Sequence, residues 1–202
     1  MVDLFDIPLF SQLLVAFLSF YFFLKKKTKF LKGIALLMLM NFLVDFAGGY
    51  LSELGVRNFL VYQYSTLLEY FLILYIYKQL IKDKRYLNIS YLLLIVFLIL
   101  WIMVFYDRTY FYKAVIVSFL NVGVLIFLFL RELLLSDEII NYKKLLPFWV
   151  SVGFMVYYLP SIPFFSIWIY MKNKDLYPIL ESLIVTMNLI ISFGLIWSSK
   201  RE

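Results

Sequence analysis

The chain contains no cysteine and no histidine among its 202 residues. Without cysteine there are no disulfide bonds and no thiolate chemistry. Without histidine, the side chain that most often serves as general base and metal ligand is missing. Zinc hydrolases with histidine ligands, serine proteases with a Ser–His pair and histidine-ligated haem are therefore excluded. We expect neither a metal nor a cofactor.

Charged residues are also scarce, and apolar ones take their place. Only 16% of the residues are charged, whereas 64% are hydrophobic and 21% aromatic, and the mean hydropathy is +0.91. A soluble domain is about 45–50% apolar. The excess is too large for one globular core and indicates that lipid is the solvent of most of the chain.

Several membrane enzymes and photoreceptors are excluded by residues that the apolar runs lack. A retinal protein needs a lysine in the middle of its last helix, but Lys172, Lys174 and Lys200 all lie outside the last run. An aspartyl intramembrane protease needs two aspartates on different helices, and only Asp45 qualifies. The paired acidic motifs that bind Mg²⁺ and pyrophosphate are absent. We expect a protein that is not an enzyme. A lipid-modifying enzyme that uses Asp45 and Glu69 stays open as an alternative.

Seven apolar runs reach or approach the ~20 residues that cross a bilayer as a helix. They are almost continuously apolar, which favours helices over the alternating strands of a barrel. No repeat or long linker divides the chain, so residues 1–202 are predicted to form one all-α, seven-helix transmembrane bundle. The loop at 131–144 is expected to be partly helical, and Pro160 and Pro163 are expected to kink or end the sixth helix, with 164–170 as a short interfacial helix. The predicted spans are 8–24, 30–51, 58–77, 87–106, 110–130, 145–170 and 176–197.

The basic residues lie between the apolar runs and predict the topology. With the N-terminus outside and the C-terminus in the cytoplasm, fourteen of the 19 Lys and Arg residues fall on the inner side, as the positive-inside rule requires. The net charge of +6 is thereby explained without a nucleic-acid partner. The first ten residues carry two acids and no base, so they do not predict a secretory signal. The basic residues left on the outer side are Arg57, Arg108, Lys113, Lys172 and Lys174.

Polar side chains from four runs are predicted to lie in the middle and outer half of the bilayer. Asn41 and Asp45 are four residues apart and so share one face of the second helix. Glu69 lies near the middle of the third helix. A shared cavity that faces outward would satisfy these groups together. The candidate ligand- or ion-binding residues are Asn41, Asp45, Gln63, Glu69, Asn121, Glu181 and Asn188.

No Lys or Arg is placed deep in a run to neutralise Asp45 or Glu69. A carboxylate in hydrocarbon must then stay protonated, hold a cation or reach water. The pattern predicts a site for a proton, a cation or a small ligand, used in transport or sensing. Hydrogen bonding between helices is the competing explanation, and for the three asparagines it is the favoured one. Tyr62, Tyr64 and Tyr70 are possible donors to Glu69.

The pair Gly48-Gly49 permits either a close helix approach or the end of the second helix, and we expect the end. The segments Asn41-Phe-Leu-Val-Asp45 and Tyr64-Ser-Thr-Leu-Leu-Glu69-Tyr70, with a Lys/Ile/Leu/Phe/Tyr-rich composition, resemble small multi-pass membrane proteins of flavobacteria and their relatives. The resemblance implies a bacterial cytoplasmic (inner) membrane and brings no activity with it. A scaffold or accessory subunit, bound to other membrane-protein subunits, is the second functional hypothesis.

Overall fold

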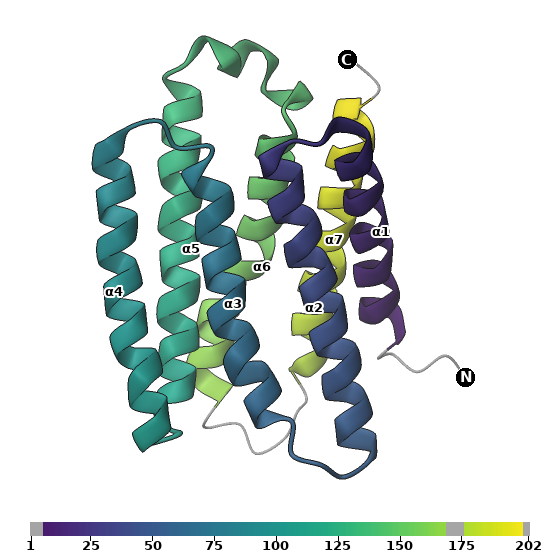
Figure 1. The fold of residues 1–202 in the computed structure, drawn as a ribbon, viewed down its shortest axis with the longest axis vertical. Helices are drawn as coiled ribbons and strands as arrows, with labels where there is room; N and C mark the ends of the chain where they lie inside the picture. Colours follow the sequence, from purple (N-terminus) through teal and green to yellow (C-terminus); the bar gives the residue numbers. More distant parts are fainter. Residues whose placement is uncertain (1–5, 169–175, 200–202) are drawn as a thin grey trace.

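The computed structural model describes residues 6–168 and 176–199, and in these ranges it contains helices and no strand (Figure 1). Seven helices are long and apolar enough to cross a membrane, which confirms the predicted number of spans and is consistent with a multi-pass membrane protein. A short 3₁₀ helix precedes the sixth. The helices are α1 (Asp6–Lys26), α2 (Lys29–Glu53), α3 (Phe59–Lys78), α4 (Lys84–Tyr106), α5 (Tyr110–Leu134), η1 (Asp137–Lys144), α6 (Leu146–Trp168) and α7 (Tyr177–Ser199).

Local chemistry explains where the helices begin. Pro8, Pro147 and Pro178 lie in the first turns of α1, α6 and α7. A missing N–H costs nothing there, because the helix has no carbonyl oxygen four residues earlier to accept from it. Thr28 caps α2, since its Oγ1 accepts a hydrogen bond from the N–H of Leu31 at 3.2 Å. The connections between consecutive helices from α1 to α5 are short, so these helices lie antiparallel to one another.

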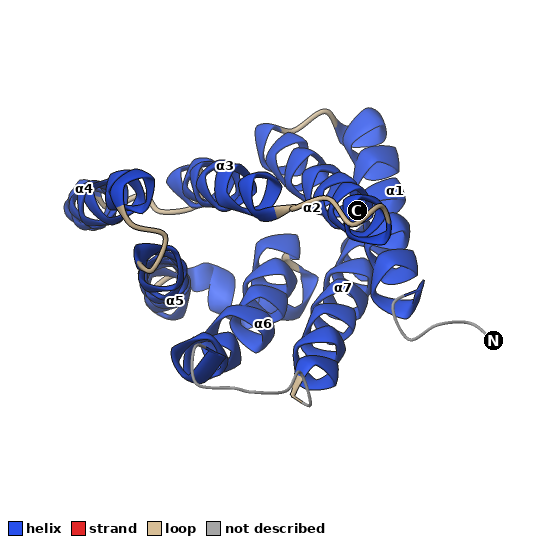
Figure 2. Ribbon diagram, turned by 90° about the horizontal axis from the view of Figure 1, so that it is seen from below, coloured by secondary structure: helices blue, strands red, loops and turns tan. Residues whose placement is uncertain are grey.

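Six of the helices form a closed ring, and α4 lies outside it. Figure 2 shows two rows, with α4, α3, α2 and α1 in one and α5, α6 and α7 in the other. The ring closes because α3 packs against α5 at one end of the rows, and α1 packs against α7 at the other. The apolar window of α5 is 56% buried and that of α4 only 17%, so α5 is the most buried of the described spanning helices and α4 the most peripheral.

The two ends of the bundle differ in chemistry. One end carries the α1–α2 and α3–α4 turns and η1, with lysines at each of them, and we call it the basic end. The opposite end carries the start of α1 and the α2–α3 and α4–α5 loops, and we call it the mouth end (Figure 1). That the mouth end faces outside stays a prediction from the charge pattern.

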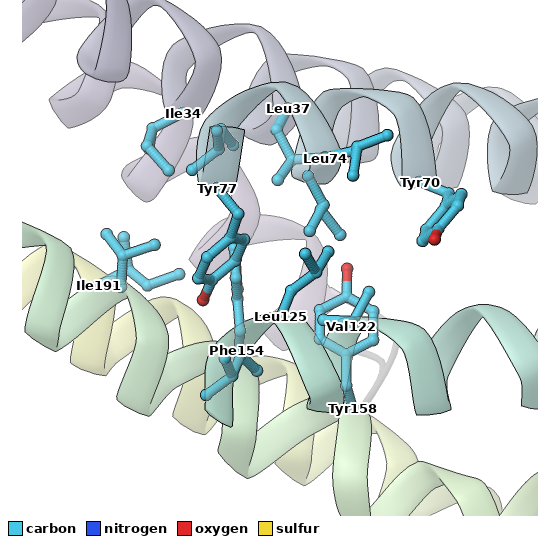
Figure 3. Packing of buried hydrophobic residues seen from close by; sticks show 14 of the residues in the cluster. Ile34, Leu37, Tyr70, Leu74, Tyr77, Val122, Leu125, Phe154, Tyr158 and Ile191 are labelled. Atoms are coloured by element: carbon cyan, nitrogen blue, oxygen red, sulfur yellow. The ribbon is translucent and has the colours of Figure 1, made fainter. Parts of the chain in front are cut away.

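An apolar core fills the half of the ring that is nearer the basic end. Leu37, Tyr77, Phe154 and Ile191 are all fully buried there and meet from four different helices (Figure 3). The phenol of Tyr77 and the hydroxyl of Ser151 share a hydrogen bond of 2.9 Å, which joins α3 to α6 inside the core. The ring is therefore closed by side chains on this side.

The sixth helix is continuous to Trp168, as the predicted span of 145–170 requires, so the alternative that it ends at Pro160 is wrong. Proline removes the N–H that would bond to the carbonyl oxygen four residues earlier, but packing against neighbouring helices lets a membrane helix continue through it. Next to Pro160, Ser161 adds a hydrogen bond from its hydroxyl group to the carbonyl oxygen of Tyr157 at 2.7 Å. The alternative short helix at 164–170 is thus absorbed into α6 as far as 168, and its last two residues lie outside the described ranges.

The second helix does not end at Gly48-Gly49 but runs on to Glu53, which corrects the other expectation about breaks. Gly48 is buried, and a Cβ at this position would lie 2.7 Å from Cζ of Tyr62. The glycine therefore serves close packing between α2 and α3. The loop at 131–144 is partly helical as predicted, because α5 continues to Leu134 and η1 follows.

Candidate functional site

A cavity of about 600 Å³ occupies the half of the ring nearer the mouth end. It is lined by the first turns of α1, the second half of α2, the first halves of α3, α5 and α7, and the second half of α6. All these segments approach the mouth end, whereas the apolar core closes the other side. The volume falls in the ~300–1,000 Å³ range of small-molecule sites.

Asp45 and Gln12 form a polar pair on the wall of this cavity. The Nε2 of Gln12, on α1, donates a hydrogen bond of 2.6 Å to Oδ2 of Asp45, on α2. Gln12 is only 5% exposed, and its Oε1 receives no hydrogen bond from the described residues. A buried amide oxygen without a donor is costly, so this atom marks a place where a donor is wanted.

Glu69 lies deeper in the cavity and is held from the opposite row of helices. The phenol of Tyr158, on α6, donates a hydrogen bond of 2.5 Å to Oε1 of Glu69. Tyr158 is 1% exposed, whereas Glu69 is half-buried and lines the cavity. The carboxylate thus has one oxygen anchored by a buried donor while its side chain borders the open space.

The three tyrosines of α3 that were possible donors to Glu69 take other positions. Tyr64 is exposed on the outer face and packs edge-on against Trp101. Tyr70 is buried against the ring of Phe97. Tyr62 lines the cavity but is seven residues from Glu69, or ~10 Å along the helix.

Four of the seven predicted site residues line the one cavity. Asp45 and Glu69 are joined there by Asn41 and by Glu181, which is half-buried at the start of α7. Among the described residues that line the cavity, three are carboxylates and none is Lys or Arg. No group of three acids in the described ranges is close enough to hold a metal ion. The cavity is therefore acidic without being a compact metal centre.

The other three predicted residues lie elsewhere and join helices. Asn121 donates to the carbonyl oxygen of Leu93 on α4 at 3.0 Å. Asn188 donates to Oγ of Ser11 on α1 at 2.9 Å. Gln63 is buried, and its backbone carbonyl oxygen accepts from Nε1 of Trp101 on α4 at 3.2 Å. Hydrogen bonding between helices, the favoured explanation for the asparagines, holds for Asn121 and Asn188.

Aromatic rings form much of the remaining wall. They come from α3, α5, α6 and α7 and surround the same space that the carboxylates border. Ser65 and Thr66 add two hydroxyl groups, and both donate to the carbonyl oxygen of Tyr62, at 3.0 and 2.8 Å. Because these hydroxyl hydrogens are already donated, Ser65 and Thr66 can act only as acceptors toward the cavity that they line. The aromatic residues are Phe59, Tyr62, Phe111, Tyr112, Phe119, Tyr157, Phe165 and Tyr177.

Sequence reasoning missed Gln12, Tyr157 and Tyr158. Gln12 did carry a signal, because an amide one turn inside an apolar run needs a partner. The two tyrosines carried none, since phenols are common throughout this chain. Comparison of the chain with protein-family models, curated proteins and solved structures gives no match. The function is therefore inferred from the residues of the cavity.

Proposed function

We propose that this protein binds a positively charged ligand or ion in the acidic cavity, which opens at the mouth end, and that it acts in transport or sensing in a bacterial cytoplasmic membrane. One observation carries the proposal. Asp45, Glu69 and Glu181 come from three helices and border one cavity of about 600 Å³, whose described lining includes no Lys or Arg.

The free-energy cost of placing these carboxylates inside the bilayer region supports a role in binding. Ionisable groups inside the bilayer region are expensive and are found at ion and substrate pathways. Gln12 donates one hydrogen bond to Asp45, and Tyr158 donates one to Glu69. These bonds orient the two carboxyl groups but do not neutralise their charge. A cleft lined by charges of one sign and walled by apolar groups concentrates counter-ions ~10–1,000-fold. Cations are therefore favoured over anions and neutral solutes.

The apolar core makes the site one-sided. Tyr77, Phe154 and Ile191 are fully buried between the cavity and the basic end (Figure 3). A ligand thus enters and leaves through the mouth end in this conformation. The positive-inside rule assigns that end to the outside, so the ligand comes from the extracytoplasmic side.

The chain's lack of cysteine permits a direct test by thiol labelling. Ser65→Cys places one thiol on the cavity wall, and Ser118→Cys places one in the buried face of α5 outside the cavity. We expect the impermeant cationic reagent trimethylammonioethyl methanethiosulfonate to label Cys at 65 from outside intact cells and to leave the matched position 118 unlabelled. Labelling of neither position, or of 65 only from inverted vesicles, would contradict the proposal.

A further inference from the structure

We propose that the ligand is a primary ammonium ion carrying an aromatic or other apolar body, rather than an inorganic cation. The inference rests on the proposed function and names the ligand class of that same cavity. It combines three features of the wall: an unsatisfied acceptor beside Asp45, a surplus of aromatic rings, and a volume far larger than one ion.

The polar groups near Asp45 accept hydrogen bonds. The Oε1 of Gln12 has no donor among the described residues, and Asp45 Oδ1 and Oδ2 are acceptors when charged. The hydroxyl hydrogens of Ser65 and Thr66 are already given to a backbone carbonyl oxygen. A primary ammonium group brings three N–H donors and no acceptor, which matches such a wall. A quaternary ammonium ion has no N–H to offer Gln12.

The aromatic rings supply the second feature. Eight aromatic side chains of the described residues border the cavity; the face of an aromatic ring attracts a cation, and its apolar body buries apolar groups. Phe111 and Phe119 on α5 border the same cavity as Asp45 on α2, and α5 belongs to the other row of helices (Figure 2). The ammonium group is placed at Asp45 and Gln12, and the apolar body of the ligand lies against the rings of α5 and α6.

The third feature argues against a Ca²⁺ site built from clustered protein ligands and in favour of a larger ligand. A site for Ca²⁺ or Mg²⁺ gathers six or more oxygen ligands within ~2.6 Å of one point. In the described ranges no three acidic residues come together closely enough for this. The cavity instead spans Asp45, Glu69 and Glu181 on three helices and holds about 600 Å³, a size that suits a molecule of many atoms.

The test is protection of the single thiol by a defined amine. With Ser65→Cys in intact cells or proteoliposomes, phenethylammonium chloride is expected to slow labelling at concentrations where phenylacetate and sodium chloride have no effect. Asp45→Asn should raise the half-protecting concentration at least about tenfold, which corresponds to the loss of one charged hydrogen bond of ~1.5 kcal/mol or more. Glu181→Gln, at a half-buried position where folding is less at risk, should raise it by a smaller factor.

The outcomes separate this inference from the proposed function. Equal protection by sodium chloride, or efficient labelling that phenethylammonium does not slow, would overturn the ammonium assignment and leave the accessible acidic cavity standing. Protection that survives unchanged in both Asp45→Asn and Glu181→Gln would also overturn it. Failure to label Cys at 65 at all would overturn the proposed function itself, and the ammonium assignment with it.

Discussion

The hydrogen bond from Tyr158 to Glu69 gives a sharp test of whether the cavity holds a charged carboxylate. Tyr158→Phe removes only the hydroxyl group of a ring that is 1% exposed, so the packing of α6 against its neighbours is kept. What is lost is a donor 2.5 Å from Glu69. The structure offers a matched neutral pair in Tyr77 and Ser151, at 2.9 Å, which also joins α3 to α6.

The two pairs are expected to differ in coupling free energy. Hydrogen bonds between neutral side chains in membrane proteins average ~0.6 kcal/mol in double-mutant cycles. Hydrogen bonds to a charged group contribute ~1.5–3 kcal/mol. We therefore expect a coupling of about 1.5–3 kcal/mol between Tyr158 and Glu69 and about 0.6 kcal/mol between Tyr77 and Ser151.

The assay is reversible unfolding in mixed lipid–detergent micelles, titrated with a denaturing detergent and followed by tryptophan fluorescence. One cycle uses Tyr158→Phe, Glu69→Ala and the double variant. The control cycle uses Tyr77→Phe, Ser151→Ala and their double variant. A coupling for the Tyr158 pair that is no larger than that of the control pair would refute the charged acceptor and weaken the case for an acidic cavity.

Two further predictions concern the contacts that hold the helices together. Gly48→Ala should lower the free energy of unfolding by ~1–3 kcal/mol, because the new methyl group overlaps the phenol of Tyr62, and the same detergent titration should show Tyr62→Ala restoring part of the loss. Glu132→Ala should speed proteolysis at the α3–α4 turn, since its carboxylate accepts from the N–H groups of Lys82 and Asp83, each at 2.9 Å; an unchanged cleavage rate would contradict that role.

The sequence was sufficient for the spans and insufficient for the contacts between them. Hydropathy places each helix within a few residues because lipid demands a continuous apolar run. The expectation that Gly and Pro end a helix failed at Gly48 and Pro160, because both residues lie in helices that pack against neighbouring helices, as Gly48 does against Tyr62. These contacts depend on neighbours that local patterns do not specify.

The candidate site likewise has residues that the sequence predicts and contacts that it does not. Depth along the helix identified Asp45 and Glu69, because acids stand out in an apolar run. The helix that lies opposite each polar side chain decided the rest. Glu181 and Asn188 lie on one stripe of α7, yet Glu181 borders the cavity and Asn188 bonds to Ser11 on α1. Such a choice depends on which helix lies opposite, and the sequence of α7 does not contain it.

The central claim is that a water-accessible cavity holds uncompensated negative charge. It is tested most directly by the ratio of labelling rates at Ser65→Cys for the cationic reagent and its anionic sulfonatoethyl counterpart, each normalised to a free thiol. We expect a ratio of about ten or more, which should fall towards one when Asp45→Asn, Glu69→Gln and Glu181→Gln are combined. A ratio near one with all three acids present would contradict the account.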